Sequence, residues 1–109
     1  MLNARANGVH VGFLRRDLLD EPPPEMDVLL AADTWYEGTL AERVLPWLRA
    51  AAAGGTRVLV GDPGRRYLPD PTTAGLRELA RYDIHTTTVL EDRALVQARV
   101  FALDAAPPR

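Results

Sequence analysis

The sequence predicts a small α/β domain whose mostly parallel sheet ends in an antiparallel hairpin. Strand-like and helix-like segments alternate along the chain, as they do in parallel sheets covered by helices. The apolar run at 27–32 is bounded by polar residues, which is typical of a strand buried on both faces. Only residues 91–94 join the last two strand-like segments, and so short a connection permits only antiparallel pairing. The 109 residues suffice for one domain, 1–109.

The N-terminal part of the chain is predicted to contain the end of a helix, a strand and a loop. Residues 1–7 read as the last turns of a helix, and Gly8 is a typical helix stop. Valine and phenylalanine alternate with other residues at 9–15, which predicts a strand. An acidic loop is expected at 17–25, because its three consecutive prolines can extend neither a helix nor a β-ladder. The strand at 27–32 follows.

The rest of the chain alternates helices with strands. Residues 39–53 carry leucine, valine and tryptophan at helical spacing, and Pro46 is expected to kink this helix or loosen one turn. The segments that complete the order are a strand at 56–60, a loop at 61–71, a helix at 72–82, and strands at 83–90 and 95–103.

The composition excludes several classes of function. The net charge is −2 at pH 7, so no overall attraction to nucleic acid or to an anionic membrane is expected. Cysteine is absent and His10 and His85 lack a metal-ligand spacing, so no metal site is expected. Serine and lysine are also absent, which excludes them as nucleophiles. With no apolar span of transmembrane length and no signal-peptide pattern, we expect a cytoplasmic protein.

Three polar loops follow predicted strands and are candidates for one site. The first loop holds Asp17, the second Asp33, Trp35, Tyr36 and Glu37, and the third Asp62, Gly64, Arg65 and Arg66. Ligands of open α/β sheets bind outside the carboxyl ends of the strands. Structural interpretations stay open beside this one: Asp33 as a cap or turn residue, the aromatic pair as cover for a core edge, and the third loop as a type II turn. The residues alone therefore indicate an α/β ligand-binding half-domain without identifying the ligand.

Two segments, DVLLAADTWYEGTLAERVLPWLR at 27–49 and RVLVGDPGR at 57–65, resemble a known family. The similarity is to the seven-strand S-adenosylmethionine-dependent methyltransferases, in the branch of the family 16 lysine methyltransferases. Within this branch it is to the electron-transfer-flavoprotein β-subunit lysine methyltransferases, whose bacterial relatives are often labelled nicotinamide N-methyltransferase-like. The Asp-x-x-Tyr element at 33–36 is typical of the branch, and the Gly-Asp-Pro-Gly-Arg element at 61–65 is more specific. The resemblance covers about residues 2–103.

This resemblance implies a Rossmann-like sheet that lacks the first two strands of the methyltransferase fold. The strand at 9–15 would be the third of the family, and 1–109 would form a single incomplete domain, its C-terminal portion. The missing part includes the glycine-rich cofactor loop and the acidic end of the second strand. The resemblance therefore implies S-adenosylmethionine as the cofactor of the complete fold, with weak or undetectable binding by this chain alone.

The resemblance also assigns roles to individual residues. It implies that Asp17 hydrogen-bonds the adenine amine, that Leu18 contacts the adenine ring, and that Ala32 and Asp33 lie beside the methionine end of the cofactor. It implies that Trp35, Tyr36, Asp62 and Arg65 bind the substrate. Asp33, which can orient the amine and stabilise its developing charge, and Tyr36 are the expected catalytic residues.

The function implied is N-methyl transfer, with the lysine side chain of a protein as substrate. Two alternatives stay open: a catalytically incomplete fragment or interaction module of the same fold, and a small-molecule N-methyltransferase. Because the missing strands would leave one edge of the strand at 27–32 unpaired, we expect this strand either to pair directly with 9–15 or to mediate self-association through its open edge.

Overall fold

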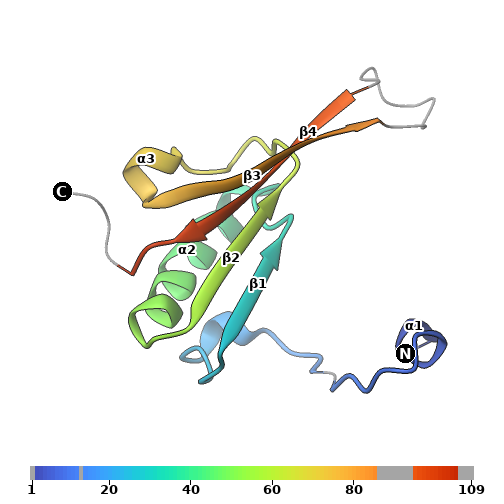
Figure 1. Ribbon diagram of the computed structural model, residues 1–109. Coiled ribbons are helices and arrows are strands. Elements are labelled where there is room, and N and C mark those ends of the chain that lie inside the picture. The colour runs from blue at the N-terminus through green and yellow to red at the C-terminus, as the bar shows by residue number, and fades with distance from the viewer. Residues whose placement is uncertain (1, 13, 86–94, 106–109) are drawn as a thin grey trace.

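The computed structural model describes residues 2–12, 14–85 and 95–105 (Figure 1). A short helix and a 3-10 turn precede a four-stranded sheet that carries one long helix on one face. In chain order the elements are α1 (Leu2–Ala6), η1 (Leu18–Asp20), β1 (Val28–Ala32), α2 (Gly38–Ala53), β2 (Arg57–Asp62), α3 (Pro71–Ala74), β3 (Leu76–His85) and β4 (Leu95–Leu103).

The strands lie in the order β1-β2-β4-β3. β1 and β2 are parallel, with Val28 opposite Arg57 at one end and Ala32 opposite Gly61 at the other. β4 runs antiparallel to both of its neighbours, β2 and β3. The sheet is therefore mixed: the expected parallel character is confined to β1 and β2, and the expected antiparallel pairing of the last two strands is confirmed.

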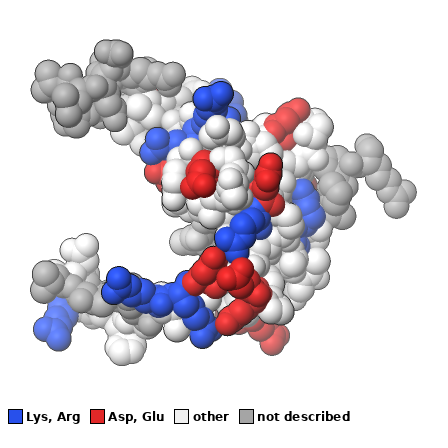
Figure 2. Space-filling view, turned by 180° about the vertical axis from the view of Figure 1, so that it is seen from behind, with Lys and Arg blue, Asp and Glu red and all other residues white. Residues whose placement is uncertain are grey.

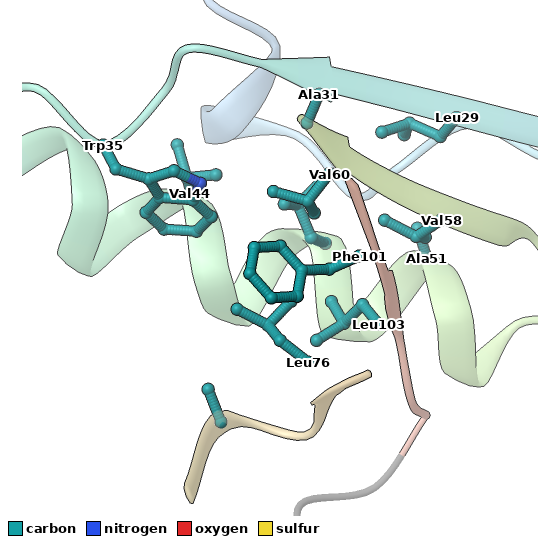
Figure 3. Close-up of a cluster of buried hydrophobic side chains, with 12 residues drawn as sticks. Leu29, Ala31, Trp35, Val44, Ala51, Val58, Val60, Leu76, Phe101 and Leu103 are labelled. Carbon is teal, nitrogen blue, oxygen red and sulfur yellow. The ribbon is translucent and has the colours of Figure 1, made fainter. Parts of the chain in front are cut away.

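The core lies between the sheet and α2. Alternate residues of the central strands point towards α2, among them Val58 and Val60 of β2 and Phe101 of β4 (Figure 3). The apolar stripe of α2 meets them with Val44 and Leu48, as the helical spacing of its sequence predicts. Figure 3 shows the indole of Trp35 next to Val44, at one end of this cluster.

The opposite face of the sheet has no helix over it among the described residues (Figure 1). In β1 the burial alternates strictly, so that Leu29 and Ala31 are buried whereas Leu30 is 73% exposed. Tyr82 and Ile84 of β3 are exposed as well. Because β1 pairs only with β2 in the described part of the chain, its other edge carries backbone N–H and C=O groups without a strand partner.

The predicted strand at 9–15 is wrong. Its described residues form no strand, and Val9, Val11 and Leu14 are all exposed. Alternating apolar residues stabilise a strand only where a neighbouring strand satisfies the backbone, and none of the described strands pairs with this segment. Of the two alternatives expected for the edge of β1, direct pairing with 9–15 does not occur among the described residues, and self-association stays a prediction.

The predicted helix at 72–82 is also wrong, apart from its first turn. α3 begins after Asp70, whose carboxylate accepts the Thr72 N–H at 3.1 Å, and it ends at Gly75. Gly75 has φ +75°, the left-handed conformation that glycine adopts readily at a helix end. The chain then enters β3, which pairs with β4 over its whole length. Long-range pairing thus overrides the helical spacing of this segment.

The remaining predictions hold to within two residues. β1, α2, β2 and β4 lie where strands and a helix were expected, and α1 with Gly8 at φ +66° forms the expected N-terminal helix end. α2 continues as one helix through Pro46. The predicted strand at 83–90 is described only to His85, where β3 ends, and the connection at 91–94 lies outside the described residues.

Candidate functional site

The site begins where β1 ends, at Asp33. The Asp33 N–H donates to the Gly61 carbonyl at 3.1 Å, which extends the ladder between β1 and β2 by one bond beyond Ala32. Asp33 has φ +56°, and it is the one residue other than glycine with a positive φ in the described part of the chain. Aspartate tolerates this left-handed conformation better than most residues, but the conformation still costs free energy. The backbone turns sharply here and directs the following residues over the end of the sheet.

The Asp33 carboxylate forms a two-point ion pair with Arg65. Arg65 Nε lies 2.5 Å from Oδ1, and Nη2 lies 2.9 Å from Oδ2. This hydrogen bonding lowers the pKa of the Asp33 carboxyl below its ordinary value of 3.8, although partial desolvation opposes the effect. Asp33 and Arg65 are both about half exposed, so the pair lies at the surface. The structure thus brings together two residues that the sequence placed in separate loops.

Asp62, at the end of β2, orders the loop that carries Arg65. Its side chain is 2% exposed, and its Oδ2 accepts the Gly64 N–H at 2.7 Å and the Arg65 N–H at 3.1 Å. Gly64 has φ +99°, as the third residue of a type II turn requires. In the described structure Asp62 faces backbone rather than solvent, and it fixes the position from which Arg65 reaches Asp33.

The two aromatic residues after Asp33 lie in different environments. Trp35 is fully buried in the core, whereas Tyr36 is 58% exposed. The Trp35 carbonyl accepts the Tyr67 N–H at 3.0 Å, which ties this turn to the loop after β2. Tyr36 is therefore the ring of this pair that a ligand at the surface can reach.

The segment 33–35 is locally unfavourable for stability. Besides the positive φ of Asp33, the buried Thr34 Oγ1 and Trp35 Nε1 have no hydrogen-bond partner among the described residues. Each unpaired buried polar group costs about 1–3 kcal/mol. Such costs concentrate at functional sites, where geometry rather than stability determines the conformation.

The first predicted loop does not join this site. Asp17 caps η1, accepting the Leu19 N–H at 3.0 Å and a bond from Arg43 of α2 at 3.2 Å. These two interactions, the backbone one first, lower the pKa of Asp17. No hydrogen bond or ion pair links Asp17 with Asp33 in the part of the chain that the structure describes. Because the described residues of 9–15 form no strand, the expectation that all three loops follow strand ends is wrong for this one.

Arg43 also contacts Asp20 at 2.8 Å, so that two acidic residues beside the partly buried Leu18 share one cation. Figure 2 shows acidic and basic side chains next to one another on the face seen there.

A groove beside the site was not predicted. It has a volume of about 400 Å³ and lies between the first turns of α2 and the loop after β2, with Trp35 in its lining. The other residues that line it are Gly38, Ala41, Glu42, Leu45, Pro46, Tyr67 and Pro69. In the sequence, the signal for this groove is an acidic residue, Glu42, one helical turn before Pro46.

The described residues contain no group of three or more histidine or acidic side chains able to hold a metal ion. None of the helices in the described ranges has the length and apolar character needed to cross a membrane.

Comparison with known proteins finds related lysine methyltransferases. The chain is 28% identical over 106 residues to the electron transfer flavoprotein beta subunit lysine methyltransferase of Xenopus laevis, a match that covers 94% of the chain and 43% of that protein. It is 30% identical over 103 residues to the protein of the same name from Rattus norvegicus, covering 92% of the chain and 40% of the relative. The Mus musculus protein is 29% identical over a match of the same length.

No protein-family model and no solved structure matches the chain. The four curated matches carry the same name and cover most of the chain at 28–30% identity. The chain is therefore similar over most of its length to the electron transfer flavoprotein beta subunit lysine methyltransferases, and it spans about two fifths of the length of the Xenopus laevis, Rattus norvegicus and Mus musculus proteins.

Proposed function

We propose that this chain forms the substrate side of an S-adenosylmethionine-dependent N-methyltransferase that acts on a lysine side chain of a protein. The observation that carries the proposal is the match to the lysine methyltransferases over more than nine tenths of the chain. The turn at 33–35 supports the proposal as well. The Asp-x-x-Tyr element begins there, directly after β1, and Asp33 has a positive φ, which is a costly conformation of the kind found at functional sites. Under this proposal the sheet is the second half of a Rossmann-like fold.

S-adenosylmethionine, when bound, supplies a methyl group that an amine nitrogen can attack in line. The chemistry of Asp17 suits a hydrogen bond from the adenine amine, because its carboxylate accepts one bond at each oxygen and keeps further lone pairs. Leu18 and Ala32 are the apolar residues proposed to contact this cofactor. These residues fit part of the cofactor, and the glycine-rich loop expected for the rest does not occur in the sequence.

Asp33 and Tyr36 are the proposed catalytic residues. The Asp33 carboxylate can accept a hydrogen bond from the lysine amine and so align its lone pair, and it can stabilise the positive charge that develops on nitrogen. Arg65 keeps this carboxylate ionised and fixed in position. The exposed ring of Tyr36 can hold a methylated ammonium by cation–π attraction. Trp35 and Asp62 contribute to the substrate side through the groove wall and the loop.

A chimera tests this proposal. Residues of this chain replace the matching residues of the Rattus norvegicus relative, and transfer of a radiolabelled methyl group is measured to the electron transfer flavoprotein beta subunit and to nicotinamide. We expect label on the protein at lysine and none on nicotinamide. The matched variant Asp33→Asn retains a residue that tolerates positive φ but removes the charge, and it is expected to lower turnover at least tenfold.

Two outcomes would contradict the proposal. A chimera that folds and binds the cofactor but labels nicotinamide instead of the protein would favour a small-molecule methyltransferase. A chimera in which Asp33→Asn transfers methyl groups at the unchanged rate would remove Asp33 from the reaction. Cofactor binding is measured separately, by isothermal titration of the 109-residue chain with S-adenosylmethionine. We expect this chain to bind the cofactor far more weakly than the Rattus norvegicus relative does.

The alternative of an interaction module is favoured by one observation, the open edge and uncovered face of β1. Leu30 is 73% exposed on a strand whose outer edge has no described partner. We propose that the chain self-associates through this edge. Light scattering over a concentration series should show oligomers, and Leu30→Lys should reduce them, because edge charges oppose strand addition. A monodisperse monomer at every concentration would contradict self-association.

A further inference from the structure

The groove beside the site combines apolar walls with a backbone acceptor that the helix cannot use. In an α-helix each N–H bonds to the carbonyl four residues earlier. Pro46 has no N–H, so the Glu42 carbonyl lacks its regular helical donor. Residues four apart lie on one helix face, and Glu42 and Pro46 both line the groove. The Glu42 carbonyl thus has no i+4 N–H donor on the helix turn that borders the groove.

The Glu42 side chain supplies a second acceptor. Glu42 forms no ion pair or hydrogen bond through its side chain with any other described residue. Arg43, the next residue of α2, pairs with Asp17 and Asp20 instead. The groove is therefore lined by a glutamate that forms no ion pair among the described residues, and the rest of its lining is mostly apolar.

The other wall is shaped by Tyr67. A Cβ atom on Gly38 would lie 3.3 Å from Tyr67 Cε1, so the absence of a side chain at Gly38 lets the ring pack closely on the start of α2. The guanidinium of Arg66 lies 5.5 Å from the centre of the same ring. The hydrogen bond from the Tyr67 N–H to the Trp35 carbonyl connects this wall to the turn that follows Asp33.

We propose that this groove binds a lysine side chain of a protein partner. The four methylene groups of the stem would lie against the apolar walls at Leu45, Tyr67 and Pro69, and the ammonium would donate to the carboxylate and the free carbonyl of Glu42. An ammonium carries three N–H donors and so can serve both acceptors at once. The identification of this partner as the methylated protein rests on the proposed function: the groove would then hold a second lysine, next to the one that reacts.

The test titrates the isotope-labelled 109-residue chain with two capped peptides, acetyl-Gly-Gly-Lys-Gly-Gly-amide and the same peptide with norleucine in place of lysine. Norleucine has an apolar stem without the ammonium. Amide shifts in the NMR spectrum should move at Gly38, Ala41, Glu42 and Tyr67. The lysine peptide should bind at least tenfold more tightly than the norleucine peptide.

Three variants separate the proposed contacts from a general effect. Glu42→Gln removes the carboxylate and should weaken lysine-peptide binding about tenfold. Pro46→Ala returns an N–H to the Glu42 carbonyl, and it should weaken binding severalfold while raising the melting temperature, so misfolding cannot explain the loss. Glu25→Gln makes the same charge change in the loop before β1 and should leave the affinity unchanged.

Equal affinity for the two peptides would overturn the proposal, as would unchanged affinity in Glu42→Gln or an equal loss in Glu25→Gln. Unchanged affinity in Pro46→Ala would overturn the role of the carbonyl. These measurements need neither cofactor nor methyl transfer. A result against lysine binding in the groove is therefore distinct from a result against the proposed methyltransferase function.

Discussion

The segment at 9–15 and strand β4 have similar alternating apolar sequences and opposite environments. In β4, Phe101 is 1% exposed, and the strand pairs on both sides, with β2 and with β3. In the N-terminal segment, Val11 is 50% and Leu14 is 64% exposed, and no described strand lies alongside. Alternation alone therefore does not make a strand. A strand needs a partner for its backbone and a covered face for its side chains.

The largest expected difference between these two regions is in the free energy of unfolding that is lost when an apolar side chain is truncated to alanine. Phe101→Ala should lower the free energy of unfolding by about 3–5 kcal/mol, because it leaves a cavity under α2. Leu14→Ala should change it by less than about 0.5 kcal/mol, because the side chain is already in water. Urea unfolding followed by circular dichroism measures both. A large loss in Leu14→Ala would mean that the N-terminal segment packs on the sheet in solution.

A smaller difference is expected between two aspartates that each order a turn. Asp62→Ala removes the buried carboxylate that accepts the Gly64 and Arg65 N–H groups and should cost about 1–3 kcal/mol. Asp17→Ala removes contacts at an exposed 3-10 turn and should cost much less. The same unfolding measurement compares them, and equal losses would show that η1 is as important to the fold as the β2 loop.

The smallest expected effect is the pH dependence of the Asp33–Arg65 pair. The pKa of Asp33 is lowered in the folded state, so the pair stabilises the fold above about pH 4 and this stabilisation is lost as the pH falls through the folded pKa. The stability difference between wild type and Asp33→Asn should be constant from pH 7 to pH 5 and vanish in stronger acid. Unfolding curves at a series of pH values test this. A difference that persists at low pH would assign the effect to the backbone turn instead of the charge.

The fold was predictable where local pattern and long-range pairing agree. The apolar run of β1, the helical spacing of α2 and the alternation of β4 each led to the observed element. The helix predicted at 72–82 is wrong because the helical spacing of these residues competes with their pairing to β4. The left-handed conformation of Gly75 ends the helix after one turn, and the register with β4 then determines the strand. The sequence pattern does not contain that register.

The candidate site was predictable to a similar degree. Polar residues at the ends of β1 and β2 pointed to Asp33 and Arg65, and the structure joins them. Trp35 is buried and Tyr36 is exposed because of how the chain packs against α2, and the sequence of two adjacent aromatic residues does not predict which of them is buried. The groove depends on the approach of Tyr67 to Gly38, a contact between residues far apart in the sequence.

Under the proposed function, the end of β1 holds the reacting amine and Asp17 binds the cofactor. The most direct test of these two roles is steady-state kinetics of the chimera with the Rattus norvegicus relative, with the cofactor concentration varied. Asp33→Asn should lower kcat with little change in the cofactor KM. Asp17→Ala should raise the cofactor KM about tenfold and leave kcat nearly unchanged, since it removes one hydrogen bond to a charged group. The reverse pattern, or a cofactor KM that does not change in Asp17→Ala, would contradict the account.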